Sequence, residues 1–429
     1  MLGKQHNDNS FPGLWEELIW RGLVKVSTDE TELQALINGE GFVYYCGFDP
    51  TAPSLHVGNL VQLLFMRRLQ LGGHSPLGLV GGSTGLIGDP RPTAERTLND
   101  RDTVSNWVNK LQEQIEVFLD SNGPNGVKMV NNLDWFGQVN AIDFLRDIGK
   151  FFRVGPMIRK EAVRKRLESD EGISFTEFSY QILQASDFLE LFRNENCVLQ
   201  TGGSDQWGNI TGGVELVRRI ESQTVHAIGT PLIENSDGTK FGKSEGNAIW
   251  LNPSMTSPFA FFQFWLNTAD ADVIERLKIF TFLTKNEIEA LHIQVNEKPG
   301  LRAAQQKLAF EVTALVHGEE IAEQVRDASK ILFGSGDLTV LTETVLEDAI
   351  NELGSVDAQS SNTIAELAVK AKLATSLGDA RRIVKQNGLS INNIKVSDAD
   401  AVLQNSDFLF GRFSLMRKGK KQLVGITKV

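Results

Sequence analysis

The sequence predicts an α/β protein in which a parallel-sheet domain is followed by a helical domain and a small α+β module. Three observations support this: a strand, helix and strand pattern near the N-terminus, the loss of strand patterns after residue 257, and a change of charge near residue 362. With 429 residues, the chain also exceeds the length at which a single core stops growing, so two or three domains are expected.

The parallel sheet is predicted from two short apolar stretches rich in strand-forming residues, GFVYYCGF (41–48) and PLGLVGG (76–82). Between them, VGNLVQLLFMRRLQ (57–70) has helical periodicity and stops before Gly72 and Gly73. A strand, a helix and a strand in this order form a βαβ unit, whose strands are parallel. We assign residues 1–245 to this domain.

Helices are predicted beyond residue 257, where four segments have the apolar spacing of helices. They are SPFAFFQFWLN, ADVIERLKIFTFL, KNEIEALHIQV and LRAAQQKLAFEVTALVHG. We assign 246–350 to a helical domain, and the polar stretch around GSVDAQSSNT predicts a linker over 351–361. Residues 362–429 predict two short helices followed by strands with a basic turn.

The net charge of −11 is unevenly distributed. Residues 362–429 contain 12 Lys and Arg against 5 Asp and Glu, a net charge of +7, which leaves −18 on the first 361 residues. A basic module on an acidic body indicates a nucleic-acid partner, because Lys and Arg neutralise phosphates. A solvated basic surface would explain any one cluster of these residues, but not so readily the whole module.

Composition excludes several other classes of protein. No apolar run is long enough to span a bilayer, and the N-terminus lacks a basic stretch followed by an apolar one, so we expect no membrane attachment and a cytoplasmic location. The only cysteines are Cys46 and Cys197, which agrees with a reducing compartment. The six histidines show no paired spacing with one another or with cysteine, so we expect no metal held by the protein.

Polar residues follow the first predicted strand. Thr51, Ser54, His56 and Asn59 surround the start of the predicted helix. The free N–H groups and the dipole of a helix N-terminus make it an anion site. Taken alone, the same residues are explained as a helix cap at Ser54 and a surface histidine.

The second strand ends in VGGSTGLIGDP (80–90), whose glycines let another group approach the backbone. This invites a dinucleotide-binding interpretation. However, the spacing is not that of the dinucleotide fingerprint, and the first strand, where it belongs, lacks it. The sequence therefore does not favour a nicotinamide-dependent dehydrogenase.

The stretch GTKFGKSEG (238–246), here called the signature loop, places Lys240 and Lys243 between glycines. Two ammonium groups on such a loop can close over a triphosphate and stabilise the charge that develops on leaving pyrophosphate. By itself, this spacing is equally explained as a solvated basic turn.

Together these motifs resemble a known family. HVGN (56–59) and KFGKS (240–244) resemble the two signatures of class I aminoacyl-tRNA synthetases. YCGFDPTAPSLHVGN, GGSTGLIGDP, FTEFSYQILQASDF and GGSDQWGNI are similar to blocks of the bacterial tyrosyl-tRNA synthetase family, and the similarity covers nearly the whole chain. The resemblance implies a Rossmann-like catalytic domain, an anticodon-side helical domain and a C-terminal RNA-binding domain.

The resemblance also implies a reaction and its participants. L-tyrosine and ATP form tyrosyl-adenylate and pyrophosphate, and the tyrosyl group passes to the 3′-terminal ribose of tRNA(Tyr). Mg²⁺ is expected through the phosphates. A homodimer is expected around DFLRDIGKFFRVGPM (143–157), although an intramolecular core contact explains that pattern equally well.

Residue roles are implied position by position. The catalytic set is Thr51, His56, Asn59, Lys240, Lys243 and Ser244. The ATP set is Cys46, Gly47, Asp49, Gly58, Gly203, Asp205 and Lys243. The tRNA set is Arg218, Arg219, Arg381, Arg382, Arg417 and Lys418. Two positions depart from the family: Asn59 replaces the usual second histidine, and the lysine after GDP is missing, with Arg91 as a replacement and Arg96 retained.

The tyrosine set is Tyr45, Asp89, Tyr180, Gln184, Asp187 and Gln206. On a helix, Tyr180, Gln184 and Asp187 share one face, and three polar groups on an otherwise apolar face indicate a buried polar ligand. The resemblance implies that Tyr45 and Asp187 bond the phenol, that Asp89, Tyr180 and Gln184 hold the ammonium group, and that Gln206 faces the carboxylate.

Two alternatives remain open at this point. A tryptophanyl-tRNA synthetase would share the fold and both signatures, but those enzymes usually lack the terminal RNA-binding module, and Tyr45 with Asp187 suits a phenol better than an indole. A non-enzymatic RNA-binding relative is less consistent with the presence of His56 and both signature lysines.

Overall fold

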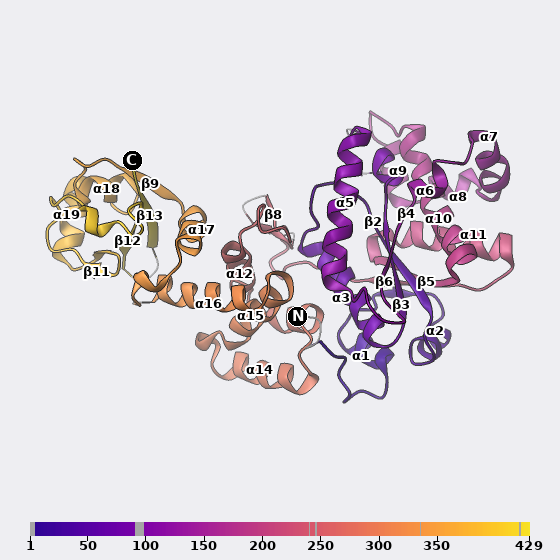
Figure 1. The fold of residues 1–429 in the computed structure, drawn as a ribbon, viewed down its shortest axis with the longest axis horizontal. Helices are drawn as coiled ribbons and strands as arrows, with labels where there is room; N and C mark the ends of the chain where they lie inside the picture. The colour runs from indigo at the N-terminus through magenta and orange to yellow at the C-terminus, as the bar shows by residue number, and fades with distance from the viewer. Residues whose placement is uncertain (1–4, 91–97, 240, 245–246, 335, 420–421) are drawn as a thin grey trace. The chain divides into compact units, whose positions relative to one another are not determined.

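The computed structural model describes residues 5–90, 98–239, 241–244, 247–334, 336–419 and 422–429 (Figure 1). It divides into two compact units: Met1–Asn252 with Ala269–Ala304, and Pro253–Thr268 with Gln305–Val429. The two units therefore divide the segment 246–350, which the sequence predicts to form one helical domain. The division of the chain into two larger domains, a linker and a C-terminal domain remains a prediction. No helix in the described part of the chain is both long and apolar enough to cross a membrane.

The first unit contains the predicted parallel sheet. Its strand order is β1-β6-β5-β2-β3-β4, and every pair is parallel except β1 with β6. The βαβ prediction is confirmed, since β2 and β3 pair in parallel around helix α3. The strands are β1 (Val26–Ser27), β2 (Val43–Phe48), β3 (Ser75–Val80), β4 (Lys128–Asn131), β5 (Cys197–Gly203) and β6 (His226–Thr230).

Helices cover both faces of this sheet. Figure 1 shows α3 (Val57–Leu71) and α5 (Arg101–Phe118) on one side and α10 (Phe175–Glu195) and α11 (Trp207–Glu221) on the other. The remaining α-helices are α1 (Leu14–Trp20), α2 (Glu30–Ile37), α4 (Thr84–Ile87), α6 (Leu133–Phe136), α7 (Ala141–Asp143), α8 (Val154–Ile158), α9 (Glu161–Leu167), α13 (Val273–Phe280) and α14 (Lys285–Glu297), and β7 (Lys243–Ser244) pairs with β8 (Asn247–Ala248).

The helical part of the second unit consists of α12 (Pro258–Leu266), α15 (Ala303–His317), α16 (Glu319–Phe333) and α17 (Glu343–Leu353). Four predicted helices are confirmed, because α12, α13, α14 and α15 coincide with the four apolar segments found in the sequence. Helix α12 buries aromatic side chains such as Phe259, Phe261 and Trp265, none more than 2% exposed.

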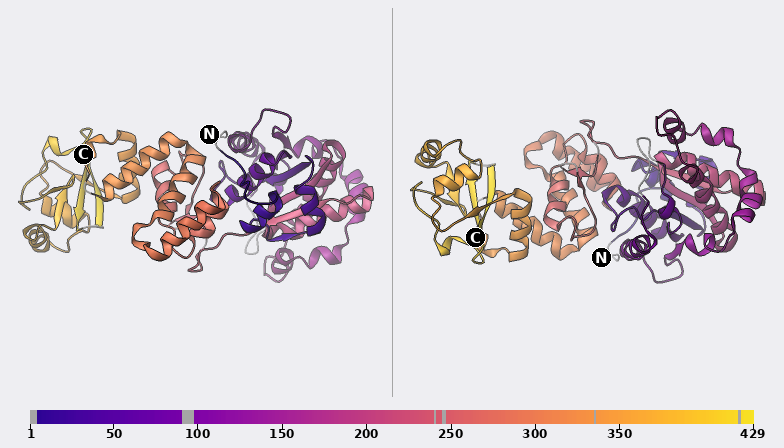
Figure 2. Two further views of the ribbon diagram at one scale, coloured as in Figure 1. Left: turned by 90° about the horizontal axis from the view of Figure 1, so that it is seen from below. Right: turned by 90° about the horizontal axis from the view of Figure 1, so that it is seen from above.

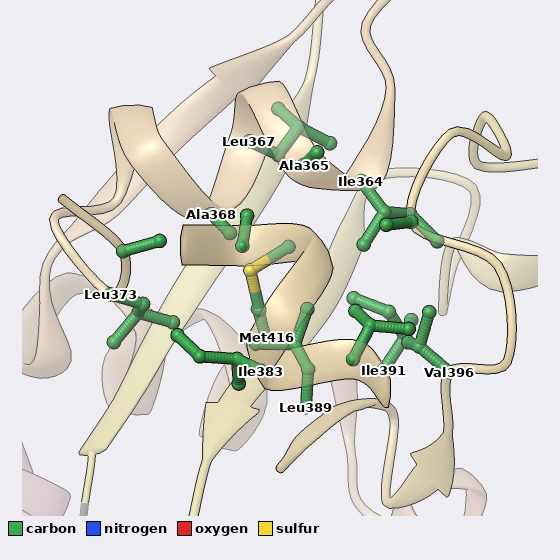
Figure 3. Close-up of a cluster of buried hydrophobic side chains, with 14 of the residues drawn as sticks. Ile364, Ala365, Leu367, Ala368, Leu373, Ile383, Leu389, Ile391, Val396 and Met416 are labelled. Carbon is green, nitrogen blue, oxygen red and sulfur yellow. The ribbon is translucent and has the colours of Figure 1, made fainter. Parts of the chain in front are cut away.

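The C-terminal module has the two predicted helices, whereas Lys420 and Lys421 of the predicted basic turn lie outside the described residues. Helices α18 (Ile364–Lys370) and α19 (Leu377–Lys385) accompany a five-stranded sheet in the order β11-β10-β12-β13-β9, drawn mostly in yellow in Figure 2. Figure 3 shows Met416 among Ala368, Ile383 and Leu389 in its core. The strands are β9 (Ser355–Ala358), β10 (Leu389–Ile391), β11 (Ile394–Lys395), β12 (Phe413–Lys418) and β13 (Gln422–Lys428).

The stretch 351–361 differs from its description as a linker, because it contains β9. Residues 355–358 pair in parallel with β13, and Ala358 is 3% exposed in the core of the module. The polar composition of this stretch indicated a linker. However, backbone hydrogen bonds to a single neighbouring strand can stabilise four residues as a strand, whatever their side chains. The module therefore begins earlier in the chain than its charge indicates.

Candidate active site

A cavity of about 440 Å³ lies within the first unit, where β2, β5 and β6 end. Ligands bind at this edge in open parallel sheets. The structure brings together nearly all residues predicted to bind ATP and tyrosine. The predicted residues that line it are Tyr45, Cys46, Gly47, Asp49, Thr51, His56, Gly58, Asn59, Asp89, Tyr180, Gln184, Asp187, Gly203, Asp205 and Gln206.

The HVGN segment forms the N-terminus of α3 at the cavity wall. His56 is the N-cap: its Nδ1 accepts a hydrogen bond from the Gly58 N–H at 3.0 Å, and its own N–H donates to Asn59 Oδ1 at 3.1 Å. A Cβ on Gly58 would lie 2.7 Å from the imidazole, so a side chain at this position would displace the His56 ring from its capping position. The cap is thus His56 rather than Ser54, and the Asn59 amide nitrogen, which has no acceptor among the described residues, can still act as a donor.

Asp49 connects the end of β2 to α10 and α4. Its carboxylate accepts hydrogen bonds from the Tyr180 hydroxyl and from Thr84 Oγ1, both at 2.6 Å. A Cβ on Gly81 would lie 2.2 Å from both Asp49 Oδ1 and Thr84 Oγ1. The glycines after β3 therefore make room for this carboxylate, which explains part of the glycine-rich stretch without a dinucleotide.

Asp187 and Tyr45 lie at the buried end of the cavity. Asp187 is 2% exposed and accepts from Trp135 Nε1 at 3.0 Å and Asn132 Nδ2 at 3.2 Å. Burial raises the pKa of Asp187 well above its usual range, although these two donors act in the opposite direction. The hydroxyl of Tyr45, 1% exposed, has no hydrogen-bond partner among the described residues, and neither does the side-chain oxygen of Gln184.

Asp89 is held by the segment that follows β5. Its carboxylate accepts hydrogen bonds from Gln206 Nε2 at 3.0 Å and Asn209 Nδ2 at 3.2 Å, and Asn209 also donates to Gln206 Oε1 at 3.1 Å. A neighbouring cavity contains Asp89 together with Lys160. Burial lowers the pKa of Lys160 to about 8, although the charge of Asp89 raises it.

Cys46 and Gly203 also line the cavity. Cys46 Sγ lies 3.7 Å from Gln62 Oε1, and the Gln62 amide donates to Thr230 Oγ1. Burial raises the pKa of the Cys46 thiol to about 12, so the thiol stays protonated. A Cβ on Gly203 would lie 2.4 Å from Asp205 Oδ1, so this glycine keeps the backbone open beside that carboxylate.

The signature loop is described in part. Gly238 and Gly242 have φ angles of +80° and +76°, which favour glycine. Phe241 lines the cavity, and the backbone of Lys243 and Ser244 forms β7. Lys240, Arg91 and Arg96, as well as the side chains of Lys243 and Ser244, lie outside the described residues, so the predictions made for them remain predictions.

The predicted tRNA cations are mostly engaged within the protein. Arg218 and Arg219 both pair with Glu215, at 2.8 and 2.6 Å, and their hydrogen bonds lower the pKa of Glu215 to about 2. Arg381 pairs with Asp400 and Arg382 with Asp379. Arg417 donates to the carbonyl oxygens of Leu332 and Gly334 and is half-buried, so it acts at least partly as a structural residue.

Several site residues were not identified from the sequence. Thr84 and Asn132 hold the carboxylates of Asp49 and Asp187, and Trp135 donates to Asp187. Asn132 follows β4, whose sequence KMVN is short and gives no strand signal. Thr84 lies inside the glycine-rich stretch 80–90. A hydroxyl residue next to a glycine was the only feature of the sequence that could have indicated its role.

This fold is that of class I aminoacyl-tRNA synthetases. Residues 38–334 match the family described as "tRNA synthetases class I (W and Y)". A C-terminally truncated mitochondrial tyrosyl-tRNA synthetase of Aspergillus nidulans has a similar structure, with a TM-score of 0.68 and 30% identity, over 76% of this chain and 95% of that chain.

The C-terminal module and the relatives specify the family further. Residues 346–426 match the "Tyrosine–tRNA ligase SYY-like C-terminal domain". A tyrosine–tRNA ligase of Leifsonia xyli is 60% identical over 427 residues, 99% of this chain and 96% of that protein, and one of Streptomyces avermitilis is 55% identical over 96% of this chain and 98% of that protein. The chain belongs to the tyrosine–tRNA ligase family, so the expectations of a class I fold and of an aminoacyl-tRNA synthetase are confirmed.

Proposed function

We propose that the cavity binds L-tyrosine and ATP together, forms tyrosyl-adenylate with release of pyrophosphate, and passes the tyrosyl group to the 3′-terminal ribose of tRNA(Tyr). The observation that supports this most directly is the buried end of the cavity, where the Tyr45 hydroxyl and the Gln184 side-chain oxygen lack partners among the described residues. Buried polar atoms are normally hydrogen-bonded, so a polar ligand is expected beside them.

Tyrosine fits this arrangement at both of its ends. Its phenol would lie between Tyr45 and Asp187, where the first offers a hydroxyl that no described residue bonds and the second a carboxyl group fixed by two donors. Its ammonium group would meet Asp89, Tyr180 and Gln184, because a carboxylate stabilises a cation. Gln206, oriented by its hydrogen bond to Asp89, would face the carboxylate of the substrate.

Activation requires no general base, because the tyrosine carboxylate is already ionised. One of its oxygens attacks the α-phosphorus of ATP, and the bond from that phosphorus to the bridging oxygen breaks, so pyrophosphate leaves with the electron pair. Catalysis then depends on positioning and on electrostatic stabilisation of the phosphates. Thr51, His56 and Asn59 surround the N-terminus of α3, a suitable place for this charge.

The remaining ATP contacts follow from the other walls. Cys46, Gly47, Asp49, Gly58, Gly203 and Asp205 would bind the nucleoside, and Lys240, Lys243 and Ser244 would meet the leaving pyrophosphate. Among the described residues there is no group of three or more metal-ligating side chains. A Mg²⁺ ion held through ATP phosphates suits this site, since such ions need few protein ligands.

The same proposal includes tRNA and a second copy of the chain. The basic C-terminal module would bind tRNA(Tyr) through phosphates. Near the predicted dimer segment, Ile142, Leu145 and Val154 are 71%, 53% and 60% exposed, which supports an interface there. Phe151 and Phe152 instead pack against the core of the first unit, so only the exposed part of the segment would form the interface.

Pyrophosphate exchange into ATP, measured with each amino acid in turn, tests the proposal. Only tyrosine should support exchange, and addition of tRNA(Tyr) should then give aminoacylated tRNA. Exchange with tryptophan in place of tyrosine would assign the other substrate. The absence of exchange with every amino acid would leave an RNA-binding role without catalysis.

A further inference from the structure

The segment leading into the signature loop is fixed to the start of α13. The Ser236 N–H donates to both carboxylate oxygens of Asp272, at 3.2 and 3.3 Å, and the Ser236 hydroxyl donates at 3.1 Å. Asp272 is 8% exposed and immediately precedes the helix. These hydrogen bonds join residues that are 36 positions apart in the sequence. The segment before the signature loop is therefore attached to the start of α13, which is not part of the loop.

Arg276, one turn further along α13, contacts the same segment at two more points. A terminal nitrogen of its guanidinium donates to the carbonyl oxygen of Glu234. Its Cζ lies 4.9 Å from the ring centroid of Phe241, and that ring also stacks on Phe280 at 5.5 Å and 28°. Phe241 stands between the two signature lysines and lines the cavity, so Arg276 contacts the cavity wall through a single ring.

The burial of Arg276 indicates a positional role. Its side chain is 1% exposed, whereas that of its ionic partner Glu275 is 59% exposed. A buried cation whose counter-ion is in water adds little to the free energy of folding. A planar guanidinium that bonds a carbonyl and covers an aromatic face does, however, fix the geometry of both groups.

The returning leg of the loop is fixed to the other signature. The Ile249 N–H donates to the carbonyl of Gly242 at 2.9 Å, and the Val57 N–H donates to the carbonyl of Ile249 at 3.0 Å. A Cβ on Gly242 would lie 2.8 Å from Val57 Cγ2. One leg is thus attached to α13 and the other to the first turn of α3, with the lysines in the chain between them.

We propose that Arg276 is a positioning residue for the activation step. It places the part of the signature loop that carries Phe241 so that the signature lysines meet the phosphates of ATP. Arg276 is not among the residues that line the cavity, so it would act through Phe241 and the Glu234 carbonyl. Its effect on chemistry rests on the proposed function, whereas its effect on the loop rests on the contacts above.

Arg276→Met tests the proposal in the full-length chain, because methionine removes both the charge and the donors. We expect kcat/KM for ATP in pyrophosphate exchange to fall about 10- to 100-fold, as for a small misplacement of a catalytic group. The Kd for tyrosine alone, measured by equilibrium dialysis, should stay unchanged. Arg276→Lys, which keeps the charge without the planar fork, should show a smaller loss.

Arg326→Met is the matched control, since Arg326 lies over Phe310 at 5.3 Å in the second unit. It should leave exchange kinetics unchanged. Amide hydrogen exchange provides a readout independent of activity: residues 235–239 should exchange faster in Arg276→Met than in the wild-type chain. If Arg276→Met does not fold, the same measurements on Arg276→Lys test the proposal instead.

Unchanged kinetics together with unchanged hydrogen exchange would overturn the proposal. An equal loss of tyrosine affinity would also overturn it, because it would show general damage to the site. If the wild-type chain itself catalysed no exchange, the proposed function would fail, and the hydrogen-exchange comparison would still decide whether Arg276 holds the loop.

Discussion

The two compact units differ in how they use polar groups. In the first, the half-buried carboxylate of Asp49 and the buried one of Asp187 lie beside a cavity, and each is held by donors from other elements. In the second, Arg381 and Arg382 of the basic module are exposed, and they already pair with acids of the same module. Net charge alone thus predicts an anionic partner, but not which cations contact it.

The difference follows from the solvent around each group. A buried polar atom without a partner has a high free-energy cost, so its surroundings reveal what it binds. An exposed ion pair contributes only about 0 to 1 kcal/mol and is easily exchanged for another partner. The cavity can therefore be interpreted residue by residue, whereas the basic surface needs experiments.

The largest expected effect is at the phosphate end of the cavity. Lys243→Ala should lower the rate of tyrosine activation about 10²- to 10³-fold, as loss of one preorganised electrostatic contact does. The Kd for tyrosine should change little, since only interactions stronger in the transition state affect the chemical step. Pre-steady-state formation of the adenylate and equilibrium binding measure the two quantities. A parallel loss of tyrosine affinity would contradict the assignment.

The next effect is at the phenol end, where β2 provides a matched pair of tyrosines. Tyr45→Phe should reduce the preference for tyrosine over phenylalanine by about 1–3 kcal/mol, or about 5- to 150-fold, since a buried hydrogen bond to the substrate is lost. It should not lower the stability of the empty protein, because the Tyr45 hydroxyl has no partner among the described residues.

Tyr44→Phe should do the opposite. Tyr44 is also fully buried, but its hydroxyl donates to the Met66 carbonyl, so the variant should lose about 1 kcal/mol of folding stability and keep its amino-acid preference. Exchange kinetics with both amino acids and thermal unfolding of both variants make the comparison. If preference were unchanged in Tyr45→Phe, the phenol would bind elsewhere.

Much of the site could be predicted from the sequence, because its residues lie in contiguous motifs. The helix periodicity that places Tyr180 and Asp187 on one face is local, and both line the cavity as expected. Asn132 and Trp135 could not be found, because they reach Asp187 only once β4 joins the sheet edge beside β3. The strand β9 was missed for the same reason, since pairing with β13 defines it.

A smaller effect is expected on the salt dependence of tRNA binding. It should differ between cations of the basic module that are paired with acids and those that are not. Lys385 is exposed on α19, and its side chain has no ion pair or hydrogen bond with the described residues, in contrast to that of Arg381. If Lys385 neutralises a tRNA phosphate, Lys385→Ala should reduce the slope of log affinity against log salt by roughly 0.7 to 0.9. Arg381→Ala should reduce it less. Equal slopes for both variants would show that the Arg381–Asp400 pair opens when RNA binds.

The smallest effect concerns a buried polar atom of the second unit, His317 on α15. Its Nε2 has no partner among the described residues, its ring packs edge-on against Phe261 at 4.8 Å, and burial lowers its pKa from 6.5 to about 4. Between these pH values the unfolded chain binds a proton that the folded chain does not, so stability is fully present above pH 6.5 and is lost as the pH falls towards 4.

In His317→Leu this loss of stability at low pH should be smaller, and unfolding followed at several pH values measures it. Unlike Tyr45, His317 is not assigned to a substrate, so pyrophosphate exchange at neutral pH should be unchanged. Identical pH dependence in the two proteins would show that another group causes the acid sensitivity of this unit.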